Sequence, residues 1–182
     1  PYTLATLNDA LSAGSVTLNN NLTIPSGYTV NILSSKPLTI APGVILTNNG
    51  GYIRNNKSAI YNHGTVDNGG TIYNDGTIDN YGTFDNGGTI YNVGNGDRPT
   101  INNNGTINNS GIIYNGTSTT KHGIINNLST INNYDTINNY DTINNSGRIN
   151  NNNGTIISPD GWSGGWLVAA EIFKGDINLD GV

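Results

Sequence analysis

A six-residue repeat with one large apolar residue per unit runs from Ile60 to Ile149 and constrains the fold of this chain. The unit is close to Gly-Thr-Ile-Xaa-Asn-Xaa, as in GTIYND and GTFDNG. Asn follows each apolar position by two residues, with Lys121 as the exception, and Gly usually precedes it by two. The apolar positions are Ile60, Val66, Ile72, Ile78, Phe84, Ile90, Ile101, Ile107, Ile113, Ile125, Ile131, Ile137, Ile143 and Ile149, with Thr119 in the one polar slot.

This spacing predicts short β-strands joined by corners. An amphipathic helix needs apolar residues at i, i+3, i+4 and i+7, which the repeat does not supply. In a strand, Thr faces out, Ile faces in, and the next residue faces out again. Asn then turns the chain, and Gly supplies unusual backbone angles at the corner. One such strand buries nothing alone, so the chain must coil with each unit about 4.8 Å from its equivalent.

The outward residues indicate the length of one coil. Asp67 recurs as Asp85, and Tyr73 recurs as Tyr91, both 18 residues on. This predicts a three-sided coil of about 18 residues, with Ile stacked on Ile and Asn hydrogen-bonded to Asn along the axis. A two-sided 12-residue coil also matches part of the pattern, since Tyr61 recurs as Tyr73. We favour three sides because the thinner coil has no room for stacked Ile and Phe.

Three segments are expected. Residues 1–14 are predicted to form an N-terminal cap, with a short amphipathic helix over 3–11 that covers the first coil. Residues 15–157 are predicted to form the β-solenoid. Residues 158–182 depart from the repeat, and their tryptophans, Trp162 and Trp166, are expected to fold over the last coil as a cover. A role for this tryptophan pair in stacking against carbohydrate is the alternative.

The less regular strands before the repeat resemble those of a known fold. The stretches SVTLNNNLTIPSGYTVNI and KPLTIAPGVILTNNGGYI are similar to the first coils of right-handed parallel β-helix proteins. The Asn-rich units look like those of secreted, adhesin-like microbial surface proteins. The resemblance implies an all-β, single-stranded, right-handed parallel β-helix. Left-handed hexad helices are the structural alternative, but right-handed crossovers are strongly preferred. The resemblance says little of function, because β-helices serve as lyases, hydrolases, adhesins and inert fibres.

Composition narrows the range of partners. Net charge is −5 and only 10% of residues are charged, which argues against nucleic acid, since phosphate contacts need cationic side chains. No stretch approaches 18 apolar residues, so no membrane span is predicted. The absence of Cys excludes disulfides and thiolate metal sites. The chain begins at Pro1 without Met, which suggests a processed mature form. The resemblance to secreted surface proteins implies an extracellular, cell-surface location.

The C-terminal stretch GDINLDGV carries a candidate metal site. Asp176, Asn178 and Asp180 occupy positions 1, 3 and 5 of an EF-hand-type loop, Gly181 the sixth, and the carbonyl of Val182 the seventh. The stretch also resembles the opening of a dockerin calcium loop. The sequence stops before the carboxylate at position 12, so a neighbour completes the site, the rest is missing, or binding is weak. Ca²⁺ is the predicted ligand.

The acidic residues of the repeat offer a second candidate site. Asp67 and Asp85 are expected to stack about 5 Å apart, near the separation of a retaining glycosidase pair. Asp79 falls on another side of the coil, and no Arg or Lys is placed to grip a uronate. We therefore favour a solvent-facing ladder over a catalytic pair. Asp135 and Asp141 stand in the glycine slot and are interpreted as corner variants.

Few other residues suggest chemistry. The phase breaks at 92–99, which is expected to form a protruding loop in place of part of one side. Asp97 and Arg98 lie in this loop and are interpreted as solvated. His63 and His122 are isolated, with no second ligand at a metal spacing, and are predicted to be surface residues. No catalytic residues are predicted, and we do not expect an enzyme.

These observations favour a structural function. A nearly uncharged exterior of Thr, Asn and Tyr can pack against copies of itself without desolvating ions. The first hypothesis is therefore an extracellular surface protein, a rigid β-solenoid that self-assembles into a filament, sheath or layer. The alternative is an adhesin or carbohydrate-binding module with glycan partners, tethered through the dockerin-like tail. A polysaccharide-active enzyme is the third and least favoured hypothesis.

Overall fold

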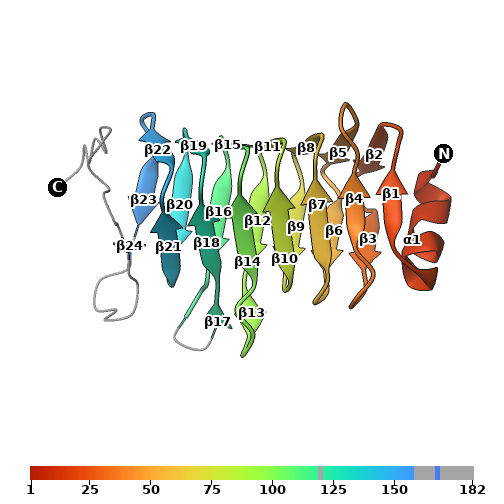
Figure 1. The fold of residues 1–182 in the computed structure, drawn as a ribbon, viewed down its shortest axis with the longest axis horizontal. Coiled ribbons are helices and arrows are strands. Elements are labelled where there is room, and N and C mark those ends of the chain that lie inside the picture. The colour runs from red at the N-terminus through yellow and green to blue at the C-terminus, as the bar shows by residue number, and fades with distance from the viewer. Residues whose placement is uncertain (119–120, 158–166, 169–182) are drawn as a thin grey trace.

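The computed structural model describes residues 1–118, 121–157 and 167–168, and the chain winds as a right-handed parallel β-helix with three sheets. Each turn of the coil, here called a rung, adds one strand to each sheet (Figure 1). Helix α1 (Leu4–Ala13) packs across one end, and its Leu7 and Leu11 are fully buried. The predicted all-β, three-sided solenoid with an N-terminal helix is confirmed.

The three sheets contain eight, seven and seven strands. Sheet A contains β1 (Val16–Leu18), β4 (Leu38–Ile40), β7 (Ala59–Asn62), β10 (Thr77–Asn80), β14 (Thr100–Asn103), β18 (Ile124–Asn127), β21 (Thr142–Asn145) and β24 (Leu167–Val168). Sheet B contains β2 (Leu22–Pro25), β5 (Ile45–Asn49), β8 (Thr65–Asn68), β11 (Thr83–Asn86), β15 (Thr106–Asn109), β19 (Thr130–Asn133) and β22 (Arg148–Asn151). Sheet C contains β3 (Thr29–Ile32), β6 (Tyr52–Asn55), β9 (Thr71–Asn74), β12 (Thr89–Asn92), β16 (Ile112–Asn115), β20 (Thr136–Asn139) and β23 (Thr155–Ile157).

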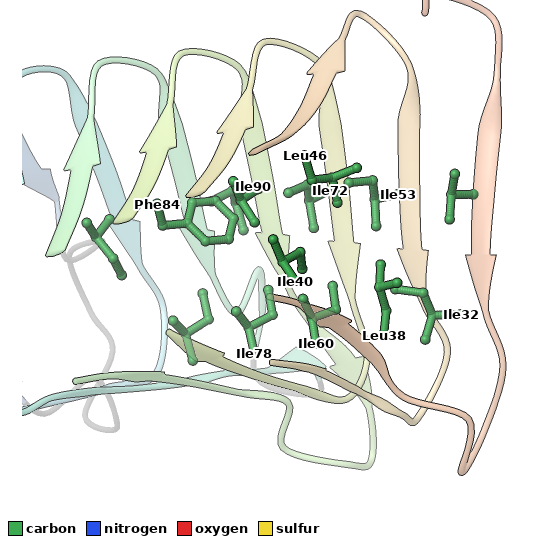
Figure 2. Close-up of a cluster of buried hydrophobic side chains, with 14 of the residues drawn as sticks. Ile32, Leu38, Ile40, Leu46, Ile53, Ile60, Ile72, Ile78, Phe84 and Ile90 are labelled. Atoms are coloured by element: carbon green, nitrogen blue, oxygen red, sulfur yellow. The ribbon is translucent and has the colours of Figure 1, made fainter. Parts of the chain in front are cut away.

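The apolar residues of the repeat fill the bore of the coil. Ile60 lies in register with Ile78, which lies in register with Ile101, so like residues stack along the axis. Figure 2 shows this stacking for the first rungs. Every apolar repeat position from Ile60 to Ile149 is at most 5% exposed. Since burial of one such side chain stabilises the fold by about 1.5–3 kcal/mol, these stacks dominate stability.

The rungs differ in length more than the repeat predicts. Asn62 and Asn80 are paired across one rung at a separation of 18 residues, as predicted. The next two rungs of the same column take 23 and 24 residues, from Asn80 to Asn103 and from Asn103 to Asn127. The first rungs, before the repeat, are also longer, since Val16 pairs with Leu38 22 residues on. The prediction of about 18 residues therefore holds for only part of the coil, which averages about 22 residues per turn.

Both insertions lie at the corner between sheets C and A. The first follows β12 and contains β13 (Gly94–Asn95); the second follows β16 and contains β17 (Lys121–His122). The two strands pair antiparallel and project from the coil (Figure 1). The expectation that 92–99 replaces part of a side is wrong, because β12 and β14 keep full register. Thr119 lies outside the described residues.

The glycines of the repeat are required for close approach rather than for unusual angles. Among the residues that the structure describes, the glycines with positive φ are Gly27, Gly43, Gly50, Gly96 and Gly116, none of which is a repeat glycine. A Cβ on Gly88, in contrast, would lie 2.1 Å from the carbonyl oxygen of Gly70 in the rung before. The same distance, 2.1 Å, separates a Cβ on Gly82 from the oxygen of Gly64. The predicted role of Gly at the corners is therefore corrected.

Three corners show what a side chain in this slot does. Ser129, Asp135 and Asp141 replace Gly, and the backbone hydrogen bonds that follow them reach the previous rung over 3.3, 3.2 and 3.3 Å. At ordinary corners, such as Thr83 to Gly64 and Thr89 to Gly70, these N–H to oxygen distances are 3.0 and 2.9 Å. At these three corners successive rungs lie a few tenths of an ångström further apart, whereas Pro99 in the same slot leaves Thr100 N 2.9 Å from the oxygen of Gly76.

The Asn of each unit forms the predicted ladder inside the corners. Asn62, Asn80, Asn103, Asn127 and Asn145 are all buried, and each Nδ2 donates to the Oδ1 of the next at 2.7–2.9 Å. The other N–H of the amide reaches a backbone oxygen, which satisfies both donors. Since each hydrogen bond contributes about 0.5–1.5 kcal/mol, the ladder fixes register more than it adds stability.

Substitution of Gly88 by Ala is expected to destabilise the solenoid by about 1–3 kcal/mol, because its Cβ meets a backbone oxygen that cannot move freely. The matched control is the adjacent Gly87→Ala, whose Cβ has only the oxygen of Asn68 at 3.9 Å. Urea unfolding followed by circular dichroism measures both. Equal midpoints for the two variants would contradict the close-approach explanation.

Candidate functional site

The predicted calcium ligands cannot be compared with the fold. Asp176, Asn178, Asp180 and Val182 lie outside the described residues, as does the tryptophan pair that was expected to cover the last rung. Within 1–118, 121–157 and 167–168, no group of three or more His, Asp or Glu side chains gathers to hold a metal ion. The calcium site therefore stays a prediction.

The acidic pair of the repeat lies where the sequence places it. Asp67 on β8 is in register with Asp85 on β11, both on sheet B, and Asp79 lies on β10 in sheet A. The Oδ1 atom of Asp85 accepts a hydrogen bond from Asn108 Nδ2 at 2.7 Å. This carboxylate is thus one member of a surface ladder, which agrees with the interpretation that we favoured over a catalytic pair.

Outward amide ladders run along two of the three sheets. On sheet B, Asn132 Nδ2 donates to Asn108 at 2.8 Å and Asn150 donates to Asn132 at 2.7 Å. On sheet A, Asn102 donates to Asp79 at 2.7 Å and Asn126 donates to Asn102 at 2.8 Å. All four bonds point toward the N-terminal end, opposite to the buried ladder. These faces therefore present an ordered, polar and mostly uncharged array.

Sheet C carries a column of aromatic side chains. The rings of Tyr73 and Tyr91 stack with centroids 5.1 Å apart, and those of Tyr91 and Tyr114 at 5.0 Å. The guanidinium of Arg54 lies 4.8 Å above the Tyr73 ring. Burial between its neighbours raises the pKa of the Tyr91 hydroxyl, since the phenolate is poorly hydrated there. The ring faces within the stack are occupied, so a ligand would meet ring edges and hydroxyls.

A buried carboxylate anchors the second insertion. Asp141 Oδ2 accepts from the backbone N–H of Gly123 at 3.1 Å and lies 3.2 Å from Nδ1 of His122. Its Oδ1 lies 3.8 Å from the guanidinium of Arg98, in the first insertion. The Asp141 side chain is only 4% exposed. The prediction that His122 is isolated is therefore wrong, and Asp141 is more than a corner variant: it joins both insertions.

Charged residues also hold the first insertion. Lys57 Nζ lies 2.6 Å from Asp97 Oδ2, and this partnership raises the pKa of the lysine. Asp75 lies beside the same lysine; burial raises its pKa, and the positive charge of Lys57 opposes that shift. Asp97 and Arg98 are exposed, as expected of a solvated loop, and each also lies beside an oppositely charged side chain of another rung. His63 is exposed as predicted, with its ring 4.9 Å from that of Tyr81.

A groove separates the tyrosine column from the insertions. It encloses about 290 Å³ and is lined by Tyr73, Tyr91, Val93, Thr117 and Lys121. The six-residue phase does not indicate this groove, because the second insertion leaves that phase intact. The available signal was the eleven-residue gap from Ile90 to Ile101, which marks the first insertion.

Comparison with known proteins gives no matching family model, curated protein or solved structure. In the described part of the chain, no helix has the length and apolar character needed to cross a membrane.

Substitution of Asp141 by Ala is expected to open the paired insertions, because it removes the acceptor for Gly123 and the partner of His122. Hydrogen bonds to a charged group are worth about 1.5–3 kcal/mol, so trypsin cleavage after Lys121 should be faster by about tenfold. Asp135→Ala is the matched control, since Asp135 fills the equivalent slot but its side chain bonds only Thr136. Similar cleavage of both variants would show that Asp141 does not anchor this corner.

Proposed function

We propose that the protein is a structural component of a cell surface, a rigid β-solenoid that associates with copies of itself into a filament, sheath or layer. The observation that carries this proposal is the ordered amide array on sheets A and B, where like residues repeat at each rung. Such faces bury few charges on contact with a copy, so association avoids most of the cost of ion desolvation.

The N-terminal end of the coil favours lateral over end-to-end contact. Helix α1 packs against β1, β2 and β3 and covers the bore at the N-terminal end. A second molecule therefore finds no free strand edge there to continue the sheets, whereas the long sides repeat without interruption. Flat repeated sides suit periodic contacts between copies.

The finer parts of the proposal come from the resemblance. We infer a secreted, adhesin-like protein whose C-terminal stretch, with Asp176, Asn178 and Asp180, binds Ca²⁺ or docks on a neighbour. Calcium would then regulate how copies are attached rather than how each one folds. The proposed calcium site does not depend on the amide ladders of sheets A and B.

A second function is favoured by the groove beside the tyrosine column. Its volume of about 290 Å³ approaches that of small-molecule sites, and Lys121 supplies a positive charge at its wall. A short glycan with an acidic group fits this chemistry. Glycan-array binding that is lost in Lys121→Ala would support the adhesin function, and absence of binding to acidic glycans would remove it.

Purified protein is expected to form ordered polymers or sheets in negative-stain electron microscopy as its concentration rises. The reason is that the same outward residues recur at each rung, so contacts between copies can recur along the length of the rod. Samples with calcium and with chelator separate the contribution of the C-terminal stretch from that of the faces. Sedimentation velocity supplies the control for aggregation. A single monomeric species at every concentration, with and without calcium, would refute self-assembly.

A further inference from the structure

Sheet B is bordered by the most exposed large apolar side chains of the described chain. Leu128 is 58% exposed, Tyr81 51% and Tyr134 50%, whereas no other described large apolar residue exceeds 43%. Tyr81 and Leu128 lie at the corner between sheets A and B, and Tyr134 lies at the corner between sheets B and C. Apolar side chains gathered at the rim of one face are typical of an interaction surface.

The same face is open and regular. Two outward columns run along it: Asp67, Asp85, Asn108, Asn132 and Asn150; and Thr65, Thr83, Thr106, Thr130 and Arg148. No hydrogen bond within the described residues engages the hydroxyls of these four threonines. The antiparallel pair of β13 and β17 projects from the corner between sheets C and A (Figure 1). This corner lies opposite sheet B. Nothing in the described chain therefore obstructs a partner.

The first column is self-complementary. Consider a second copy that faces sheet B and is related to the first by a two-fold axis parallel to β15, passing between the two copies at Asn108. This axis reverses the order of the rungs in the second copy and keeps each column opposite itself. It places Asp85 opposite Asn132 and Asp67 opposite Asn150. Each of these amides uses one N–H within its own ladder and has a second N–H left to donate to a carboxylate. Acceptors thus face donors at both ends of the column.

We propose that a second copy of this chain docks face to face on sheet B, with the two solenoid axes antiparallel. This inference rests on the proposed function and names the surface through which copies first associate.

The borders of the face agree with this arrangement. Tyr81 lies one rung before the two-fold axis and Leu128 one rung after it, at the same corner, so each meets the other across the interface. At the opposite border, Tyr134 meets Gly87, where no atom but the oxygen of Asn68, at 3.9 Å, lies near the position of a Cβ. The three exposed apolar side chains thereby each find an apolar or an open counterpart.

Charge selects the antiparallel sense. Arg148 comes opposite Thr65 of the second copy, within reach of its Asp67 two residues away on the same strand. In a parallel pair, the carboxylates of Asp67 and Asp85 would gather at one end and the two arginines at the other. Like charges brought together in this way oppose association.

The size of the face predicts weak, reversible pairing. Five rungs at about 4.8 Å and strands of four residues at about 3.3 Å give a patch of about 24 by 13 Å. With its borders, two such patches bury roughly 1,000 Å² or less, which is the range of transient contacts. Pairing through sheet B is therefore concentration-dependent. Because a two-fold contact closes on itself, it gives a dimer, and growth into a filament or layer uses a second face of each copy.

Cysteine cross-linking tests the geometry, since the chain has no Cys of its own. Asn108→Cys should dimerise rapidly with a short bis-maleimide, because packed sheets lie about 10 Å apart and this residue faces its own copy. Asn102→Cys, on sheet A of the same rung, is the matched control. Asp67→Cys should cross-link with Asn150→Cys when the two are mixed, and not with itself.

A charge exchange tests the chemistry. Asn132→Asp places carboxylates opposite each other and should weaken dimerisation in sedimentation velocity by at least about tenfold. The double variant Asp85→Asn/Asn132→Asp again places an amide opposite each carboxylate and should recover dimerisation. Asn126→Asp, on sheet A, should have little effect on dimerisation. Circular dichroism verifies that each variant is folded.

The outcomes separate the two proposals. Cross-linking of Asp67→Cys with itself, or polymers that form without cross-linking at Asn108→Cys, would overturn the antiparallel sheet B contact and leave self-assembly standing. A protein that stays monomeric throughout would overturn both.

Discussion

The fixed spacing between successive rungs is the constraint on which the rest of this structure depends. Parallel backbone pairing holds neighbouring strands about 4.8 Å apart, and every side chain must accept that interval. β-Branched aliphatics do so in the bore, where Ile60, Ile78 and Ile101 lie in direct register. Asn does so in the corners, where amide meets amide at hydrogen-bonding distance. Glycine does so where the backbone of one corner rests on the next. The three recurring residues of the unit, the aliphatic residue, Asn and Gly, thus each satisfy the same spacing requirement.

Departures from the repeat are where this molecule acquires individual features. The two insertions leave the sheets in register, and they are held by groups that the repeat does not provide: the buried carboxylate of Asp141 and the ion pair of Lys57 with Asp97. They also create the groove beside the tyrosine column. Sheet B, in contrast, keeps the plain pattern. One molecule therefore combines a uniform side, which we propose contacts copies of itself, with a varied corner, where we place the alternative ligand site.

The fold was predictable because a strict six-residue phase leaves a chain few ways to bury its aliphatics. The stacking of Asp67 with Asp85 and the Asn ladder followed from the same phase. The first insertion was visible as an eleven-residue gap between Ile90 and Ile101. The second was hidden, since Ile113 and Ile125 are 12 residues apart, two whole units, so the phase continues across it. The role of Gly was misjudged because a contact between rungs leaves no mark in local sequence. The Asp141 contacts with His122 and Arg98 depend on both insertions folding together and could not be read from spacing.

The opposed directions of the inner and outer amide ladders have an electrical consequence. Each buried amide points its dipole toward the C-terminal end, and each surface amide on sheets A and B points toward the N-terminal end. From Asn102 onward the outward amides oppose the buried ones, so each of these rungs adds less to the moment of the rod than its buried amides alone would. This reduces the part that the amide ladders play in setting the sense in which two rods lie side by side. The few formal charges, and not the ladders, are then left to decide polarity in a bundle.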